Sequence, residues 1–183
     1  MSNLATKSGI PIGRLPAGEW QILKSPTHEK TERLLHYWQS KIDDAQMPHR
    51  SAIDPIQIPQ LMPMTAILEV ENAERVRFKV RLYGTAAVEV AGEERTGRYI
   101  DDFGEGLSEA ARLEVVARWQ KGCMAAYDTC APVFSRGVRS DPQKSHHIIH
   151  TAALPLTTDG TTVSHIFGAM TAETPKDPEN PQG

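Results

Sequence analysis

The segment that most constrains the fold is a run of strict alternation between residues 75 and 82. Large apolar side chains alternate there with cations: Val76, Phe78, Val80 and Leu82 against Arg75, Arg77, Lys79 and Arg81. Successive side chains of a strand point to opposite faces, so this period predicts a half-buried strand. Charged outer faces are routine on antiparallel strands, and nearby glutamates can offset the four cations. We therefore interpret the cationic face as solvated and expect no nucleic acid there.

The residues after this strand predict two short helices separated by glycines. Gly84 ends the strand, and residues 85–91 suit a short helix in which Thr85 is the N-cap and Gly92 ends the last turn. Threonine can accept from first-turn amides, and glycine tolerates a left-handed backbone. A second glycine stop at Gly97 leads into another short helical turn at residues 99–103.

Helical periodicity predicts two longer helices. The first spans about 27–44, can be capped by Ser25 or Thr27, and has one apolar stripe: Leu34, Leu35, Trp38 and Ile42. The stripe suits packing on the chain's own sheet or on the same helix of a second chain, and both alternatives remain open. The second begins at a Ser108 cap and runs to about 128. Its stripe contains Val115, Trp119, Cys123 and Ala126, widened by Leu113, Val116 and Tyr127.

The rest of the chain predicts further strands and a connector. Residues 64–70 form a hairpin with the alternating strand through a polar turn at 71–74. The Pro-rich stretch 47–63 is an ordered connector, because a residue before proline favours extended geometry. Three more strands are expected at 132–139, 146–156 and 163–171.

Several motifs in this order resemble those of a known family. They are Arg-Leu-Tyr-Gly-Thr-Ala at 81–86, Ala91-Gly92, Thr96-Gly97-Arg98-Tyr99, the segment 54–63, and Leu154-Pro155-Leu156 with Asp159-Gly160. Together they resemble the PAS-like domains found mostly in bacteria, in particular the compact PAS_5 type, over roughly residues 28–172. The resemblance implies an α+β fold: a five-stranded antiparallel sheet with short helices and one long helix across it, preceded by an N-terminal amphipathic helix.

The domain organisation follows from length and composition. A chain of 183 residues can bury the core of one domain without metals or disulfides. We expect a flexible arm at 1–24, a single PAS-like domain at 25–172 and a disordered, proline-containing tail at 173–183. The net charge of −3 gives no reason to expect nucleic acid or an anionic membrane as a partner. Without an apolar run long enough to span a membrane or a signal peptide, a cytoplasmic protein is expected.

Adjacent aspartates and a group of histidines are the candidates for catalysis and metal binding, but their spacing does not favour either role. Asp101 and Asp102 are adjacent and point in different directions, so capping or solvation explains them better than a paired acid and base. His146, His147 and His150 share one predicted strand: His147 and His150 face opposite sides, and His146 and His150 are too far apart for joint tetrahedral ligation without help, which favours a structural or surface role. The sequence therefore predicts no catalytic residue and no metal site.

The resemblance also bears on cofactors. Haem-binding PAS sensors use a histidine on the long helix before the third strand, and residues 108–128 contain none. Flavin-binding photosensors of the superfamily place a reactive cysteine after the second strand, whereas Cys123 and Cys130 come later. Cys123 lies on the apolar stripe, where a packing thiol is expected. We expect no cofactor, neither haem nor flavin.

One set of residues is a candidate ligand pocket. Arg81 lies in the family-like motif at the strand end and could bind a carboxylate bidentately. Binding cavities mix aromatic walls with a few polar groups, which suggests four companions: Tyr83, Tyr99, Trp119 and His150. Alternation alone does not say which face of the strand meets the pocket.

The function that the resemblance implies is a non-enzymatic sensory or signalling module. Such a module binds a small-molecule ligand or a protein partner and acts on a separate effector protein, and a homodimer is expected. One alternative is a pure protein-interaction or dimerisation module whose cavity is filled by its own side chains. Another is a small α+β enzyme of the isomerase or dehydratase kind, although here a hairpin precedes the long helix.

Overall fold

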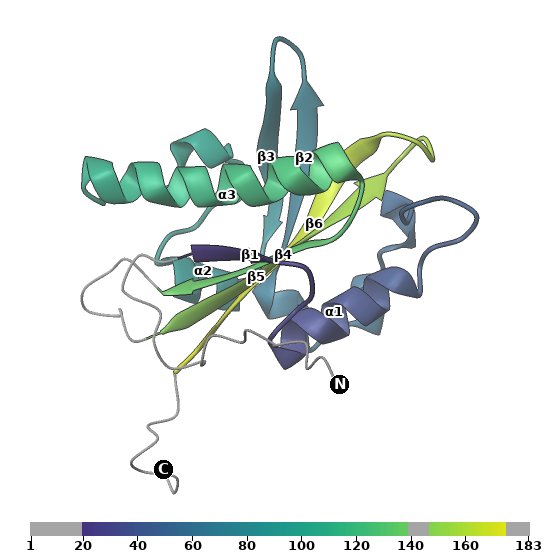
Figure 1. Ribbon diagram of the computed structural model, residues 1–183, viewed down its shortest axis with the longest axis horizontal. Helices are drawn as coiled ribbons and strands as arrows, with labels where there is room; N and C mark the ends of the chain where they lie inside the picture. The colour runs from purple at the N-terminus through teal and green to yellow at the C-terminus, as the bar shows by residue number, and fades with distance from the viewer. Residues whose placement is uncertain (1–19, 139–146, 175–183) are drawn as a thin grey trace, which may run out of the picture.

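The computed structural model describes residues 20–138 and 147–174, which form one antiparallel sheet with helices on both faces. The strand order is β1-β4-β5-β6-β2-β3 (Figure 1). The strands are β1 (Trp20–Leu23), β2 (Thr65–Asn72), β3 (Val76–Tyr83), β4 (Val133–Val138), β5 (Ile148–Thr157) and β6 (Val163–Glu173). The α-helices are α1 (Glu29–Gln39), α2 (Thr85–Ala91) and α3 (Glu109–Thr129).

Short 3-10 turns complete the described elements. Three of them follow one another in the proline-rich connector: η1 (Arg50–Ala52), η2 (Pro55–Gln57) and η3 (Met62–Met64). The fourth, η4 (Ile100–Asp102), is the short turn expected after Gly97. No helix in the described part of the chain is both long enough and apolar enough to span a membrane.

The sheet has six strands, so the expected five was wrong. The additional strand is β1, whose residues fall within the arm expected at 1–24. It pairs antiparallel with β4, from Trp20 opposite Gly137 to Leu23 opposite Phe134. Four residues are too few to show a period, so only pairing with the edge of β4 defines the strand. Residues 1–19 lie outside the described part. Of the tail expected at 173–183, residues 175–183 also lie outside it, and Glu173 is the last residue of β6.

The helices cover opposite faces of this sheet. Figure 1 shows α3 running across the sheet, with α1 lying apart from it. In β6, Phe167 alternates with Ile166 and Gly168, and the Phe167 ring lies 6.4 Å from the Tyr37 ring of α1. Ile166 and Gly168 face α3 instead. Each face of β6 is therefore covered by a different helix.

α1 packs on the chain's own sheet through the predicted stripe. Leu34 and Trp38 are buried, Leu35 and Ile42 pack partly buried against the core, and the Trp38 indole N–H donates to the Pro155 carbonyl at 2.8 Å. The helix is capped by His28, whose Nδ1 accepts from Lys30 N, rather than by Ser25 or Thr27. It is also shorter than the expected 27–44.

A β-bulge decides which face the end of β3 presents. Leu82 pairs with Ile67 and Val80 pairs with Leu68, which leaves Arg81 extra on β3. Tyr83, opposite Ala66, therefore lies on the same face as Val80 instead of alternating with it. The strict alternation predicted from sequence holds through Val80 and then reverses.

The turn from β3 into α2 requires a glycine. A Cβ on Gly84 would lie 2.3 Å from the Pro63 carbonyl oxygen, closer than any side chain allows. Gly84, not Thr85, is the N-cap of α2, and no side chain caps that end. Gly92 ends the helix with a φ of 79°, as the sequence predicted.

Candidate functional site

A cavity of about 450 Å³ lies between α3 and the sheet. This volume is within the range of small-molecule sites in proteins. Its walls come from β1, β2, β4, β5, β6, α2, α3 and the loops before and after η4: Trp20, Leu68, Val90, Ala91, Arg95, Gly106, Leu107, Ser108, Ala111, Val115, Arg118, Trp119, Gly122, Cys123, Ser135, Ile149, Thr151, Ala152, Ala153, Ile166, Gly168 and Met170.

Small residues on both walls leave this space open. Ala152, Ala153 and Gly168 form the floor on β5 and β6, and Gly122 lies on the facing side of α3. A Cβ added at Gly122 would meet no atom within 4 Å. Protein interiors are normally packed to crystal-like density, so a void of this size reflects the absence of side chains that would fill it.

The most enclosed charge in the cavity wall is Arg95, whose side chain is only 4% exposed. It lies in the loop between α2 and η4. The Nε and Nη2 groups donate to Glu93 Oε1 at 3.0 and 2.8 Å, and Nη1 donates to Tyr83 Oη at 3.3 Å. Burying a charge is costly unless it is paired and hydrogen-bonded, and these contacts provide the pairing.

Aromatic rings surround the Arg95 guanidinium. Its central carbon lies 4.1 Å from the Phe103 ring centroid, 5.3 Å from that of Trp119 and 5.6 Å from that of Tyr83. These distances lie within the range of cation–π attraction. Phe103 and Trp119 also pack edge to face at 5.4 Å. The cation is thus held rigidly between the end of β3, α3 and η4.

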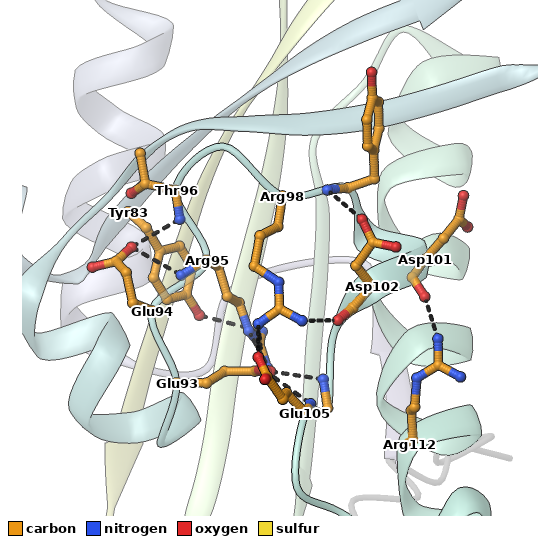
Figure 2. Close-up of polar contacts among 12 residues, drawn as sticks. Tyr83, Glu93, Glu94, Arg95, Thr96, Arg98, Asp101, Asp102, Glu105 and Arg112 are labelled. Atoms are coloured by element: carbon orange, nitrogen blue, oxygen red, sulfur yellow. Dashed lines mark hydrogen bonds and ion pairs between the residues drawn. The ribbon is translucent and has the colours of Figure 1, made fainter.

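Glu93 connects the loop between α2 and η4 with the loop that follows η4 (Figure 2). Besides Arg95, its carboxylate accepts from Arg98 Nη1 at 3.2 Å and from the amides of Gly104 and Glu105 at 2.8 and 3.2 Å. Burial raises the pKa of Glu93, but these amides and Arg95 outweigh burial, so the net pKa lies below its ordinary value. Glu93 is therefore ionised at neutral pH.

Tyr83 supplies a neutral hydroxyl beside this ion pair. Burial raises the pKa of its phenol to about 12, although Arg95 opposes the shift. The phenol consequently remains protonated at physiological pH. Its ring lies 6.3 Å from the Trp119 ring, which lines the cavity.

Two hydroxyls lie across the sheet from Arg95. Ser135 on β4 and Thr151 on β5 are 2.5 Å apart through their side-chain oxygens, and both line the cavity. In the strand order these strands lie on the far side of β6 from β2 and β3. The polar groups of the wall thus stand apart, with apolar surface between them.

The cavity also contains Arg118, on α3. Its guanidinium pairs with Glu114, one turn earlier on the same helix. Glu114 is not part of the cavity wall. Arg118 is less enclosed than Arg95 because it lies on the helix that covers the cavity rather than in the loop behind it.

The thiol in the wall does not have the properties of a nucleophile. Burial raises the pKa of Cys123 to about 12, so the thiolate is absent at neutral pH. This agrees with the packing role predicted from the apolar stripe. Within residues 20–138 and 147–174, no three His, Cys, Asp or Glu side chains are grouped so that they could hold a metal ion.

The structure brings together only two of the five predicted pocket residues. Trp119 lines the cavity, and Tyr83 lies directly behind it against Trp119 and Arg95. The family-like motif drew attention to Arg81, but that side chain is exposed. Its Nε lies 2.5 Å from Glu69 Oε2.

Tyr99 lies on the outer, charged face of β3. Its hydroxyl donates to Glu71 Oε2 at 2.7 Å, and its ring lies 3.7 Å from the Arg77 guanidinium. The cations of that face find acids nearby, since Arg75 and Arg77 both contact Asp101 Oδ2, at 2.8 and 3.3 Å. Of the adjacent aspartates, Asp101 therefore neutralises this face, while the Asp102 carboxylate accepts from Tyr99 N.

His150 lies on the opposite face of the sheet, near the start of α1. Its Nδ1 is 3.2 Å from Thr27 Oγ1, its Nε2 is 3.1 Å from Glu173 Oε1, and its ring lies 5.0 Å from the His28 ring. Burial lowers the pKa of His150, and Glu173 opposes this shift only in part. The residue joins α1, β5 and β6 and does not contribute to the cavity.

Sequence reasoning missed Arg95 and Glu93. They occur in Gly92-Glu93-Glu94-Arg95-Thr96, a polar stretch after a helix stop that is typical of an exposed loop. No periodicity marks Arg95 as buried. The predicted stripe of α3 was also imperfect, because Leu113 is 58% exposed.

Comparison with known families gives one match. A family model described as PAS domain, of the PAS_5 type, matches residues 26–171. No curated protein matches the chain. The match covers β2 to β5, β6 as far as Thr171, and the helices of the cavity wall, but not β1.

Proposed function

The chain belongs to the PAS domain family, and from this premise we propose that it is a sensory module that binds a small molecule beneath α3 and acts on a separate effector protein. The family supports a sensory or signalling role in general. The observation that carries the ligand proposal is the cavity of about 450 Å³, with apolar walls and a few fixed polar groups.

The elements around the cavity suggest how occupancy could reach an effector. The cavity wall includes residues of α3, α2 and the edge strand β1, so a ligand contacts elements whose other sides face outward. A ligand shifts a conformational equilibrium only by its difference in affinity for the two states. We infer that occupancy favours one arrangement of α3 over the sheet, which the effector then recognises.

Three further properties are proposals that follow from the family. We propose that the chain is not an enzyme, in line with the generally non-enzymatic character of PAS domains. A homodimer and a cytoplasmic location remain expectations. The apolar stripe of α1 packs on the chain's own sheet, which was one of the two alternatives. Whether the chain also dimerises is a question for measurement.

Native mass spectrometry with an absorbance spectrum tests the function. Protein purified without added ligand should show a mass excess that disappears on denaturation, and the excess identifies the ligand class. A mass equal to that of the chain, with no chromophore, would instead favour a pure interaction module, and effector capture from the native host would follow.

A cavity-filling variant supplies the control. Gly122→Leu points a side chain into open space beneath α3, where nothing lies within 4 Å of a Cβ. The variant should fold and lose the mass excess. If it retains a bound small molecule, the ligand lies elsewhere and the cavity proposal is wrong.

A further inference from the structure

The cavity wall carries positive charge without acid. Two of the described lining residues, Arg95 and Arg118, are cations, and none is an aspartate or glutamate. Their carboxylate partners, Glu93 and Glu114, are excluded from the wall. A molecule in this space therefore meets the guanidinium groups directly and their counter-ions only from behind.

The cluster around Arg95 contains more enclosed cations than enclosed anions. Arg95 and Arg98, the latter 26% exposed, share the carboxylate of Glu93, which is 12% exposed. The other acid that contacts Arg98 is Glu105, at 80% exposure, and an ion pair with so exposed a group contributes little. One additional negative charge would balance the enclosed part of the cluster.

Arg95 is also prepared to bind such a charge. Three of its N–H groups donate to Glu93 and Tyr83, and one N–H on each Nη has no acceptor among the described residues. The aromatic rings fix the plane of the guanidinium, so little freedom is lost on binding. Planar guanidinium groups match carboxylates well.

The remaining wall determines the rest of the ligand. Between Arg95 and the Ser135–Thr151 hydroxyl pair, the surface is formed by residues such as Leu68, Ile166 and Met170. Apolar surface of this kind is satisfied by an apolar body. Away from Arg95, the other charge in the described wall is Arg118, which is already paired with Glu114. A second carboxylate on the ligand would therefore meet either a neutralised cation or apolar surface, at a high desolvation cost.

We propose that the cavity selects an amphipathic monocarboxylate, with its carboxylate against Arg95 and its apolar body beneath α3. This inference rests on the proposed function, namely that the cavity is a ligand site.

Calorimetric titration of the full chain with three probes of equal length tests the charge preference. Decanoate, decanol and decyltrimethylammonium share the apolar body and differ in the head group. A charge-assisted hydrogen bond should make decanoate bind about ten- to a hundred-fold more tightly than decanol. The cation should bind more weakly than either.

A pair of arginine variants tests the position of the carboxylate. Arg95→Gln removes one of the two arginine partners of Glu93, so the Glu93→Gln/Arg95→Gln double variant, which leaves the net charge of the cluster unchanged, is prepared beside it. Both should bind decanol as the wild type does and lose the preference for decanoate. Arg118→Gln, the matched change on α3, should keep that preference.

The outcomes separate this inference from the function on which it rests. If the wild type binds decanol as tightly as decanoate, or more tightly, the monocarboxylate proposal is wrong, but the proposal that the cavity is a ligand site stands. Loss of preference in Arg118→Gln, with retention in the double variant, would overturn the assignment to Arg95. If no probe binds and the purified chain carries no small molecule, the ligand function itself fails.

Discussion

At the scale of single residues, the chemistry of the cavity depends on how Arg95 is held. The guanidinium is buried, so each hydrogen bond to it replaces water that cannot reach the site. Tyr83 donates no charge but accepts from Nη1 at 3.3 Å and shields one side of the cation. The hydroxyl oxygen of Tyr83 therefore contributes to stability as a hydrogen-bond acceptor for Arg95.

Tyr83→Phe removes this acceptor while preserving the ring. We expect the free energy of unfolding to fall by roughly 1–2 kcal/mol, because a buried guanidinium N–H loses its partner. Denaturant unfolding followed by circular dichroism measures the change. Tyr99→Phe, which removes a hydroxyl on the outer face, should cost less; an equal loss in the two variants would contradict the role given to Tyr83.

Two glycines should respond in opposite ways to the same substitution. Gly84→Ala forces a Cβ against the Pro63 carbonyl, 2.3 Å away, and overpacking of this kind costs about 1–3 kcal/mol. Gly122→Ala adds a methyl group to an interior helical position with free space, and should stabilise the fold by roughly 0.5–1 kcal/mol. Thermal unfolding of both variants checks the signs, and a stabilising Gly84→Ala would show that the turn can move.

At the scale of elements, the ends of the helices are determined by different chemistry. Ser108 caps α3 through its side chain, which accepts from Ala111 N at 3.4 Å. The start of α2 has no side-chain cap, because the close approach of Gly84 to the η3 turn places that residue at the N-cap. Both α2 and α3 were predicted to have a hydroxyl cap, and only α3 has one.

Alanine substitutions at the two hydroxyl residues distinguish these ends. Ser108→Ala should lower the free energy of unfolding by about 0.5–1 kcal/mol, the low end for an N-cap because the bond is long and exposed. Thr85→Ala should change it by less than about 0.5 kcal/mol. Ser108→Asp should restore the wild-type value, and a larger cost at Thr85 than at Ser108 would reverse the assignment.

At the scale of the whole molecule, His150 connects parts that are far apart in sequence. It contacts Thr27 and His28 before α1 and Glu173 at the end of β6, and Arg136 lies opposite it on β4. The lowered pKa of His150 means that the folded state holds the neutral ring where the unfolded chain would bind a proton. His165, also buried in part, has a pKa lowered in the same direction.

This difference makes stability depend on pH. Above pH 6.5, the ordinary value, both states hold His150 neutral and its contribution is complete. As the pH falls below that value, the unfolded state gains a proton first, so stability is lost, at most about 1.4 kcal/mol per pH unit for one proton.

Urea unfolding should therefore show that the free energy of unfolding declines as the pH falls from 7.5 to 5. The decline should be smaller in His150→Asn. The decline should persist in part because His165 contributes with the same sign. His36→Asn, an exposed change on α1, is the control and should follow the wild type. An unchanged slope in His150→Asn would remove His150 as its source.

Local patterns were enough to predict most elements. The alternation before Val80, the apolar stripe of α1, Ser108 as a cap and Gly92 as a stop each depend on residues within a few positions of one another. For this reason the order of two strands, helices and three strands was predictable. The family was predicted from the resemblance of the motifs. The pairing of β1 was not, because four residues carry no period and the strand exists only through β4.

The candidate site was mostly beyond prediction. Trp119 lines the cavity and Tyr83 lies behind it, but Arg81 is exposed, Tyr99 lies on the outer face of β3 and His150 is buried on the opposite face of the sheet. The decisive feature is the bulge at Arg81, which turns Tyr83 to the same face as Val80, whereas plain alternation would turn it to the opposite face. A bulge depends on the partner strand, so no pattern within β3 reveals it.

Most elements and their order followed from the sequence, because hydrophobic period and capping act between near neighbours in the chain, and the family followed from the resemblance of its motifs. The tertiary structure alone decided the number of strands, the face presented by Tyr83, the burial of Arg95 and the space beneath α3. Each of these depends on which distant segments meet, and burial of a loop arginine is possible only where Glu93 and three aromatic rings converge on it.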